Sequence, residues 1–309
     1  MKKVSVIGGG GNVGASAGLY LAERGICEVL LVDIVDGVPQ GKGLDLLQAA
    51  PLRGYDSRVH GTSDFKDIAG SDVVLVTAGF PRKPGMSRTD LLAKNAEIVG
   101  SIGNEIKKHA PGAFVVVVSN PLDIMTFHMK QATGFPAHRV CGMAGVLDSA
   151  RFRAFIALEL GVAVTDVQAM VLGGHGDSMV PLPRYATVSG VTIQDLLEPA
   201  VIERLVERTR KGGGEIVALL KTGSAFYAPG ASAARMVESI LLDNKRFLPA
   251  AAWCTGQFGI ESTYVGVPVI LGAGGVEKIV ELPLGDDDLA ALRKSADEVK
   301  EGIRELAAL

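Results

Sequence analysis

The stretch VSVIGGGGNVGAS, residues 4–16, joins a short apolar run to a helix-like segment through four consecutive glycines. Gly9, Gly11 and Gly14 in this stretch have the spacing GxGxxG. After a strand, such a turn lets the backbone approach a pyrophosphate, which then lies at the N-terminus of the following helix. The same glycines are also compatible with tight strand-helix packing alone. The motif by itself therefore leaves a nucleotide site and a structural turn equally open.

Asp33 separates these two interpretations. It ends the next apolar run, EVLLVD, about twenty residues after the glycine turn, where a carboxylate accepts hydrogen bonds from an adenosine ribose and repels a 2′-phosphate. A helix cap or a solvated strand end is the alternative role for this residue. Its position favours the ribose contact, so we predict NAD rather than NADP as the cofactor.

Similar apolar runs recur through the first half of the chain, at residues 4–8, 28–33, 72–79, 114–121 and 139–145, with helix-like segments between them. They are apolar throughout rather than alternating, which is typical of parallel strands covered by helices on both faces. A segment around Val59 is a weaker strand candidate. Together the runs predict an α/β fold with a doubly wound parallel (Rossmann) sheet of about six strands.

The pattern changes after Asp148. Longer helical segments at 149–160, 198–211, 214–220 and 231–241 alternate with strand candidates near 167–172 and 265–271, and a last helix starts at GDDD. We predict a mixed α+β catalytic domain at residues 146–309, after an NAD-binding domain at residues 1–145. No linker-like composition separates them, which indicates a rigid interface.

Composition excludes several classes of protein. The chain has 31 basic and 34 acidic side chains, a formal net charge of −3, so it has no general basic field for nucleic acid. Its three cysteines lack the spacing of a disulfide framework or a zinc site, and we expect no metal. No apolar stretch reaches the length of a membrane helix. We predict a cytoplasmic protein without a membrane partner.

Two motifs in the second half carry candidate catalytic residues. GGHGDS places His175 after an apolar run, and GVLDSARF places Asp148 and Arg151 three residues apart, on one face of a helix start. A carboxylate bonded to one imidazole nitrogen orients the ring and raises its pKa, which leaves the other nitrogen to exchange a proton with a substrate. Arg151 offers a planar fork for a carboxylate. The structural alternatives are a core histidine and a simple Asp148–Arg151 salt bridge.

Positive charge is also concentrated in AGFPRKPGMSRTD, residues 78–90. Arg82, Lys83 and Arg88 lie there among Pro81, Pro84 and Gly85. Such a loop is suited to closing over an anionic substrate and excluding water. A merely solvated basic loop is the alternative.

These motifs, in this order, resemble the NAD-dependent lactate and malate dehydrogenases, in particular the lactate-dehydrogenase-like malate dehydrogenases. The resemblance covers essentially the whole chain and also includes DIVDGVPQGKGLDLLQA (33–49), SNPLDIMT (119–126) and GVPVILGAGGVEKIVEL (266–282). It implies hydride transfer between NAD and a 2-hydroxy acid, with a small dicarboxylate as substrate. It also implies a homo-oligomer, which we expect to be a homotetramer, with a homodimer as the alternative.

The resemblance implies roles for the residues that match the family's motifs. His175 is similar to the proton donor and acceptor, and Asp148 to its orienting partner. The residues expected to bind substrate are Arg82, Arg88, Asn120 and Arg151. Those expected to contact the cofactor are Gly9, Gly11, Asn12, Val13, Gly14, Asp33, Asn95, Val118 and Asn120. The segment KTGSAFYAPG (221–230) is expected to help line the substrate pocket.

The expected reaction is the reversible NAD-dependent oxidation of (S)-malate to oxaloacetate, a step of the tricarboxylic acid cycle, by hydride transfer with a His–Asp proton relay. In the resembling family, lactate-specific members usually carry glutamine at the position of Arg82 and malate-specific members carry arginine, which favours malate. An L-lactate dehydrogenase, or another 2-hydroxy-acid dehydrogenase, is the alternative within the family. A nucleotide-sensing Rossmann protein without activity is the alternative outside it. The joint presence of His175, Asp148 and Arg151 argues against that second alternative.

Overall fold

The computed structural model describes residues 1–80 and 88–309. In this part of the chain, the first half forms a parallel sheet with the strand order β6-β5-β4-β1-β2-β3. The strands are β1 (Lys2–Ile7), β2 (Cys27–Val32), β3 (Val59–Thr62), β4 (Val73–Val76), β5 (Phe114–Val117) and β6 (Val140–Gly142). The predicted doubly wound sheet is therefore confirmed, and the weak candidate around Val59 is its edge strand. The order reverses between β1 and β4, which is where such sheets bind ligands.

The apolar strands supply both faces of the sheet. In β4, Val73 and Leu75 belong to one buried cluster, whereas Val74 and Val76 belong to another. This follows from the two-residue period of a strand, which sends successive side chains to opposite faces. A strand buried on both faces needs apolar side chains at every position, as the sequence pattern indicated.

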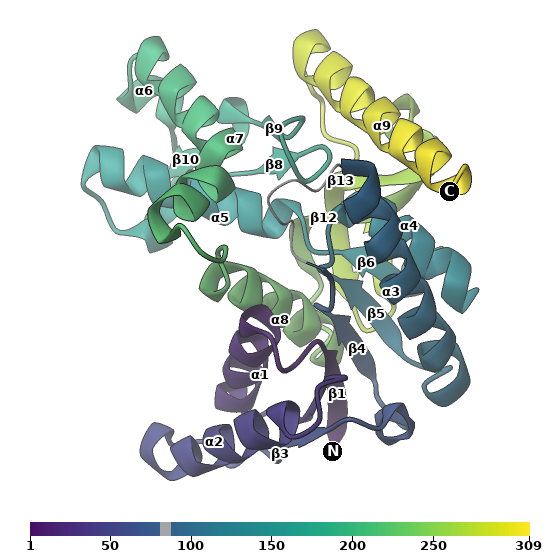
Figure 1. The fold of residues 1–309 in the computed structure, drawn as a ribbon. Coiled ribbons are helices and arrows are strands. Elements are labelled where there is room, and N and C mark those ends of the chain that lie inside the picture. Colours follow the sequence, from purple (N-terminus) through teal and green to yellow (C-terminus); the bar gives the residue numbers. More distant parts are fainter. Residues whose placement is uncertain (81–87) are drawn as a thin grey trace.

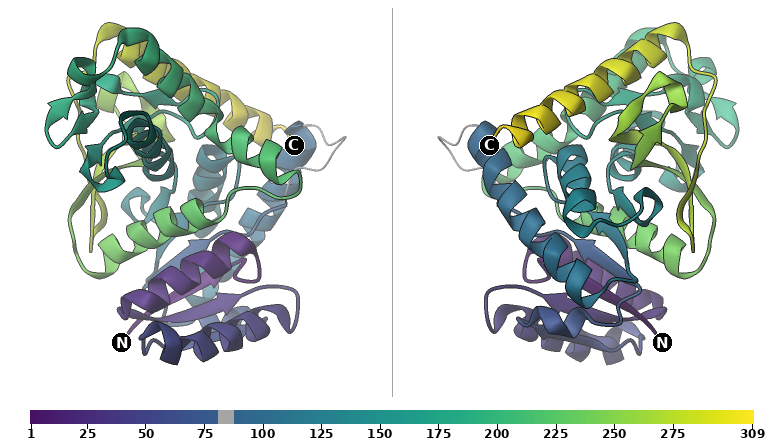
Figure 2. Two further views of the ribbon diagram at one scale, coloured as in Figure 1. Left: turned by 90° about the vertical axis from the view of Figure 1, so that its left-hand side faces the viewer. Right: turned by 90° about the vertical axis from the view of Figure 1, so that its right-hand side faces the viewer.

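Helices cover the two faces (Figures 1 and 2). The helices of the first half are α1 (Asn12–Arg24), α2 (Val38–Arg53), α3 (Arg88–His109) and α4 (Leu122–Thr133). Side chains of α1 pack into the cluster that contains Val73, while those of α3 and α4 pack into the cluster that contains Val74. The carboxyl ends of β1, β4 and β5 are left facing the second half of the chain.

The second half lengthens the same sheet. Strands β12 (Arg246–Thr255), β13 (Glu261–Gly272) and β14 (Gly275–Ile279) pair antiparallel to one another, and Ala251 of β12 pairs with Gly142 of β6. Shorter strands form two small sheets: β7 (Val167–Gln168), β10 (Thr187–Val188) and β11 (Val191–Thr192), and β8 (Val171–Leu172) with β9 (Val180–Pro181). The mixed α+β character predicted for this half is confirmed, with its main strands joined to the parallel sheet.

The helices of the second half are α5 (Gly145–Leu160), α6 (Ile193–Leu196), α7 (Pro199–Leu220), α8 (Tyr227–Leu241) and α9 (Asp286–Ala307). Helix α7 differs from the sequence prediction, because it runs without a break through Gly212, Gly213 and Gly214, where the pattern indicated two segments. Packing of α7 against α5 outweighs the weak helix propensity of glycine. The last helix begins at GDDD as predicted.

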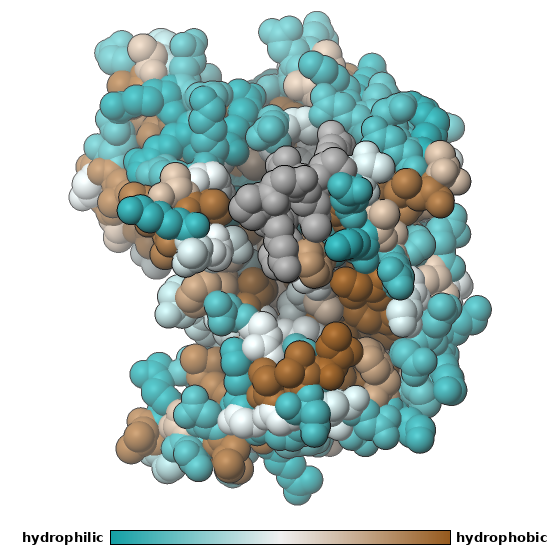
Figure 3. All heavy atoms as spheres, in the orientation of Figure 1, coloured by the Kyte–Doolittle hydropathy of each residue, from teal (hydrophilic) through white to brown (hydrophobic). Residues whose placement is uncertain are grey.

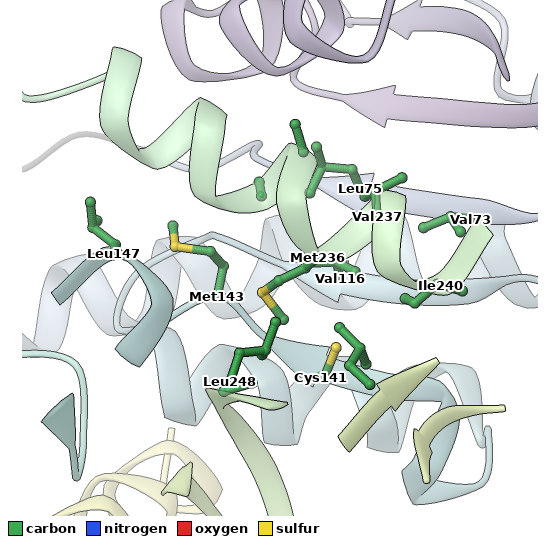
Figure 4. Close-up of a cluster of buried hydrophobic side chains, with 14 of the residues drawn as sticks. Val73, Leu75, Val116, Cys141, Met143, Leu147, Met236, Val237, Ile240 and Leu248 are labelled. Carbon is green, nitrogen blue, oxygen red and sulfur yellow. The ribbon is translucent and has the colours of Figure 1, made fainter. Parts of the chain in front are cut away.

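Helix α8 ties the second half to the sheet. Figure 4 shows Met236, Val237 and Ile240 of α8 beside Leu75 and Val116 of the parallel strands. These side chains are buried together in one apolar cluster. The cavity described below is therefore bounded by elements that share a core.

The face shown in Figure 3 is mostly hydrophilic at its outer parts, and hydrophobic residues gather toward the middle of its lower half.

Throughout residues 1–80 and 88–309, each helix is too short or too polar to span a lipid bilayer.

Candidate active site

A cavity of about 1000 Å³ lies at the carboxyl ends of the central strands. Its walls come from both halves of the chain. The first half contributes Val13 after the glycine turn, Thr77 and Gly79 after β4, and the residues that follow β5; the second half contributes α5, the segment of His175, and α7. The segment 221–230 lines it as expected, through Lys221, Gly223, Ser224, Ala225 and Pro229. The cavity thus runs from the glycine turn to the predicted catalytic residues.

The glycine turn fits a pyrophosphate. A Cβ on Gly14 would lie 2.4 Å from the carbonyl oxygen of Gly8, and one on Gly9 would lie 2.8 Å from the Leu31 side chain. Gly11 is the N-cap of α1 and supplies no side-chain hydrogen bond to it. The N–H groups of Gly9 and Gly11 are bonded to the carbonyls of Val32 and Gly8. Those of Asn12, Val13 and Gly14, in the first turn of the helix, therefore remain available to an anion.

Two glycines of the same turn, Gly8 and Gly10, have roles that sequence reasoning did not identify. Gly8 has a φ of 84°, and a Cβ there would lie 2.6 Å from the Ala78 nitrogen. A Cβ on Gly10 would lie 2.6 Å from Oδ2 of Asp33. Both positions exclude larger side chains because the backbone of the turn lies directly against its neighbours.

Asp33 directly follows β2, beside the glycine turn. Its Oδ2 accepts a hydrogen bond of 3.0 Å from the Gly10 N–H, and its Oδ1 accepts one of 3.3 Å from the Val35 N–H. These bonds hold the carboxylate at the end of the strand, next to the turn that would hold the pyrophosphate. At this position the carboxylate can accept hydrogen bonds from a ribose diol and would repel a 2′-phosphate, so the residues present fit NAD.

His175, Asp148 and Arg151 lie together. Nδ1 of His175 is 2.8 Å from Oδ2 of Asp148, and Arg151 donates a 3.1 Å hydrogen bond to Oδ1 of the same carboxylate. Asp148 is 1% exposed. The carboxylate therefore binds the imidazole and the guanidinium at once, so that the salt bridge considered above accompanies the histidine contact instead of replacing it.

The environment of His175 shifts its pKa. Burial lowers the pKa of the imidazole, whereas the charge of Asp148 and its hydrogen bond raise it, and the resulting pKa is above the ordinary histidine value. Because Nδ1 is engaged by Asp148, Nε2 is the ring nitrogen left for a partner in the cavity. Such a histidine can donate a proton near neutral pH and take it back.

One N–H group of Arg151 is left without a hydrogen-bond acceptor in the described part of the protein. Its Nε is buried and has no hydrogen-bond partner within the described residues. Its side chain lies against Gly212 and Gly213 of α7, where a Cβ would come within 3.2 Å of Arg151 Cδ and 3.5 Å of its Nη2, respectively. Buried donors without partners are costly, so the arrangement is suited to an anionic ligand.

Three predicted residues lie on the strand side of the cavity. Val118 and Asn120 follow β5 and line it, as does the buried Asn95 of α3. The side chain of Asn95 accepts a 2.6 Å hydrogen bond from the Phe80 N–H and donates one of 2.7 Å to the Asn120 carbonyl. Asn95 therefore connects the segments that follow β4 and β5, and its contact with a cofactor stays a prediction.

The basic loop falls largely outside the described residues. Arg82 and Lys83 lie in the stretch 81–87, as does most of the predicted closing loop, and although α3 begins at Arg88, the side chain of Arg88 is also outside the described part. The structure therefore brings together His175, Asp148, Arg151 and Asn120 around the cavity and leaves the two loop arginines as predictions.

Two buried residues at this site were missed by sequence reasoning. Asp123 accepts a hydrogen bond from the His175 N–H, and Ser295 accepts one from the Gly174 N–H. Asp123 stands three positions after Asn120 within SNPLDIMT, so a polar residue at a helix start was the available indication. Ser295 lies in the middle of α9, where nothing local points to His175.

The glycines beside His175 differ in their surroundings. Gly173 has a φ of 84°, and a Cβ on Gly174 would lie 3.3 Å from Ser295 Oγ and 3.4 Å from Asp123 Oδ2. These two glycines serve packing within the protein. Gly176 does line the cavity, and a Cβ there would meet no described atom within 4 Å.

Within residues 1–80 and 88–309, no group of three His, Cys, Asp or Glu side chains is arranged to hold a metal ion. The three cysteines are buried and unpaired.

Known proteins match the chain over its whole length. Residues 2–142 match the family model of the lactate/malate dehydrogenase NAD binding domain, and residues 145–309 match that of the lactate/malate dehydrogenase alpha/beta C-terminal domain. The malate dehydrogenase of Thermomicrobium roseum is 56% identical over 308 residues, which cover 100% of this chain and 99% of that protein.

Solved structures agree. The malate dehydrogenase of Salinibacter ruber has a TM-score of 0.95 at 52% identity, with 99% of this chain and 98% of that chain covered. A lactate dehydrogenase of Cryptosporidium parvum, solved with lactic acid and NAD, has a TM-score of 0.95 at 42% identity, with 100% and 98% covered. Together with the glycine turn and the His175 site, these matches show that NAD is the cofactor and that the chain belongs to the lactate/malate dehydrogenase family of NAD-dependent oxidoreductases.

Proposed function

We propose that the protein is a malate dehydrogenase, which catalyses the reversible oxidation of (S)-malate to oxaloacetate with His175 and Asp148 as a proton relay. The observation that carries the proposal is the contact of 2.8 Å between His175 Nδ1 and the buried Asp148 carboxylate, with Arg151 on the same carboxylate. The relatives named malate dehydrogenase support the choice of substrate. The reaction would place the protein in the tricarboxylic acid cycle.

In the oxidation, His175 accepts the proton of the C2 hydroxyl at Nε2, while Asp148 at Nδ1 stabilises the imidazolium that forms. NAD supplies the hydride acceptor, C4 of its nicotinamide. In the reduction, His175 returns the proton to the carbonyl oxygen. The raised pKa of His175 supports both directions, because the imidazole is then able to hold or release the proton near neutral pH.

We assign substrate binding to Arg151, Asn120, Arg88 and Arg82. Arg151 pairs with the C1 carboxylate, which would satisfy its unpartnered Nε–H or the neighbouring N–H groups. Asn120 donates to the reacting oxygen. Arg88 polarises that oxygen once the loop closes, and Arg82 pairs with the second carboxylate of the dicarboxylate.

We assign cofactor binding to the glycine turn, Asp33, Val118, Asn95 and Asn120. The turn receives the pyrophosphate at the start of α1, and Asp33 the adenosine ribose. Val118 and Asn120 line the cavity, whose wall also includes Val13 and His175. Asn95 acts through the backbone of Asn120, to which its side chain is bonded.

An L-lactate dehydrogenase is the second candidate, since a lactate dehydrogenase from Cryptosporidium parvum is 42% identical over the chain. The two candidates differ in the distal group of the substrate: malate and oxaloacetate carry a carboxylate at C4, and lactate and pyruvate a methyl group. A guanidinium facing that methyl would be left unpaired, and loss of a charge-assisted hydrogen bond costs about 1.5–3 kcal/mol. This corresponds to discrimination of roughly tenfold to a hundredfold or more.

The test is the ratio of kcat/KM for oxaloacetate and pyruvate, followed through the absorbance of NADH. We expect the wild-type protein to prefer oxaloacetate. Arg82→Gln should lower kcat/KM for oxaloacetate and raise kcat/KM for pyruvate. Lys83→Gln removes the same charge from the same loop and is the matched control. An unchanged ratio in Arg82→Gln would mean that another residue recognises the distal carboxylate, and a wild-type preference for pyruvate would favour the lactate enzyme.

We further propose that the domains meet at residues 145 and 146, and that the protein is a cytoplasmic homotetramer, with a homodimer as the alternative. Exposed leucines on α2, among them Leu44, Leu47 and Leu52, support an association of copies, since such apolar surface commonly marks an interface. Light scattering of the purified protein distinguishes the two oligomers.

A further inference from the structure

Asp123 and Ser295 hold the backbone on which His175 is mounted. His175 lies between β8 and β9, outside helices and regular strands. Its N–H donates a 2.8 Å hydrogen bond to Oδ2 of Asp123, at the start of α4, and the preceding N–H, of Gly174, donates one of 2.7 Å to Oγ of Ser295 on α9. Two consecutive peptide groups are thus oriented by side chains from two different helices.

The contact is closely packed. Asp123 is 5% exposed and Ser295 is 1% exposed. A Cβ on Gly174 would lie 3.3 Å from Ser295 Oγ and 3.4 Å from Asp123 Oδ2, so this glycine sits between the two side chains. Ser295 also donates a 3.0 Å hydrogen bond to Ser178, beyond His175. The segment that carries His175 is consequently held on both sides.

Holding the His175 N–H does not require a charged group, yet Asp123 brings a carboxylate into the core at a cost in folding free energy. Its second oxygen, Oδ1, is buried and has no hydrogen-bond partner in the described residues. A neutral acceptor would hold the His175 N–H without bringing a carboxylate into the core, where a charge is stabilised poorly unless it is fully paired. The feature left to explain is therefore the negative charge.

The charges around Asp123 and His175 come from few groups in the described part of the chain. Asp148 and Arg151 on α5 and Asp123 on α4 act on His175, and His175 and Asp148 act on Asp123. From α9, Ser295 and Val299 approach Gly174, and neither is charged. Asp123 is thus the second carboxylate near the imidazole; it lies on the backbone side, whereas Asp148 binds the ring.

We propose that Asp123 is a positioning residue for His175: its carboxylate orients the His175 peptide, together with Ser295 at the neighbouring peptide, and places a second negative charge beside the imidazole. The inference rests on the proton-transfer role proposed for His175. It adds a second carboxylate to the His175–Asp148 pair, one that acts without contact to substrate or cofactor.

The titration of Asp123 is consistent with this role. Burial raises the pKa of Asp123 to about 6, against the opposing effects of the His175 N–H and the charge of His175. The carboxyl is therefore ionised above about pH 6. Because its pKa in the folded state is above the ordinary value, the folded state becomes less stable as the pH rises from that ordinary value through the raised one.

Three variants separate the contributions. Asp123→Asn keeps an oxygen acceptor for the His175 N–H and removes the charge, Asp123→Ala removes both, and Ser295→Ala frees the Gly174 N–H without any change of charge. Thr126→Ala is the control, because Thr126 is buried in the same helix and its hydroxyl donates to the Leu122 carbonyl of that helix. Each protein is measured for kcat, KM for NADH, the NMR titration of the His175 ring and the unfolding temperature.

In Asp123→Asn we expect the His175 ring to titrate at a lower pH than in the wild type. The kcat of this variant, measured at the variant's pH optimum, should be close to that of the wild type. The variant should also unfold at a higher temperature than the wild type at pH 8. Asp123→Ala should lose roughly tenfold or more in kcat at an unchanged KM for NADH. Ser295→Ala should lower kcat and leave the His175 titration in place. Thr126→Ala should change only the unfolding temperature.

A wild-type His175 titration in Asp123→Asn would overturn the role of the charge, and a wild-type kcat in Asp123→Ala would overturn the positioning. Unfolding temperatures that fall in Asp123→Asn at both pH 5 and pH 8 would reduce Asp123 to a structural residue. The NMR titration needs no substrate. Failure of the wild-type protein to reduce oxaloacetate would therefore count against the proposed function separately.

Discussion

The side chains of the site are ordinary polar groups that burial and pairing place in an unusual environment. Asp148 has its two oxygens on His175 and Arg151, and almost none of it reaches solvent. In such surroundings a hydrogen bond between charged groups is stronger than in water, and an unpaired charge costs more. The carboxylate therefore determines both the orientation of the imidazole and its preference for the proton.

His175 should control the pH dependence of turnover. Its pKa is raised, so the imidazolium needed for oxaloacetate reduction is present below that pKa, and kcat/KM for reduction should fall as the pH rises through it. The value for malate oxidation should rise over the same range. His175→Asn should abolish turnover in both directions with NADH binding retained, as measured by titration of NADH fluorescence.

Asp148→Asn provides the comparison for this profile. Loss of the carboxylate removes the main influence that raises the pKa of His175, so the inflection should move to lower pH. Turnover at neutral pH in His175→Asn would remove the histidine from the mechanism. An inflection that stays in place in Asp148→Asn would assign the observed titration to another group.

Asp33 should determine the choice between NADH and NADPH. Its carboxylate is held beside the glycine turn by the Gly10 and Val35 N–H groups and would face the 2′-phosphate of NADPH. NADH should bind much more tightly than NADPH, and Asp33→Ser should narrow the difference. Dissociation constants measured by calorimetry test this, and equal affinities in the wild-type protein would show that the ribose contact lies elsewhere.

At the scale of elements, α7 is the helix whose sequence fits its structure least well. Three consecutive glycines cost about 1 kcal/mol each relative to alanine in a helix interior. Gly212 and Gly213 lie against the Arg151 side chain, whereas a Cβ on Gly214 would meet nothing within 4 Å. The missing side chains at Gly212 and Gly213 thus leave space for Arg151, and the weak helix propensity of glycine makes the helix less stable.

This difference predicts opposite outcomes for two neighbouring substitutions. Gly214→Ala should raise the free energy of unfolding by about 0.5–1 kcal/mol, because helix propensity improves without a clash. Gly212→Ala places its methyl 3.2 Å from Arg151 Cδ and should displace the guanidinium, so kcat/KM for oxaloacetate should fall. Chemical denaturation and steady-state kinetics on the pair test this; equal effects of both substitutions on turnover would contradict it.

At the scale of the whole molecule, the sheet joins the two halves of the chain. Strand β12 pairs with β6, and α8 packs into the same apolar cluster as β4 and β5. The cavity lies between elements of both halves, so His175 and the glycine turn keep their relative positions only as long as this shared core is intact.

The shared core predicts that the two halves unfold together. Trp253, the single tryptophan, lies on β12 and stacks with Phe127 of α4 at 6.1 Å between ring centroids. Its fluorescence reports on the junction, whereas far-ultraviolet circular dichroism reports on all helices. The two transitions in denaturant should coincide at a fixed protein concentration. A fluorescence change that clearly precedes the loss of helix would show that the junction opens first.

Many features of this protein could be predicted from the sequence, because they depend on local patterns of residues. Apolar runs without alternation identified the parallel strands, the glycine spacing and Asp33 identified the cofactor end, and the spacing of Asp148 and Arg151 placed them on one helix face. Each of these depends on residues that are close in sequence or on a pattern with a fixed period.

Other features became visible only in the folded protein. The pairing of β12 with β6, the unbroken course of α7 through its glycines, and the contacts of Asp123 and Ser295 with the backbone around His175 join segments far apart in the chain. Burial and pairing at such contacts depend on which surfaces meet when the helices pack on the sheet. No local pattern encodes that meeting, because the free energy that selects it comes from the assembled core.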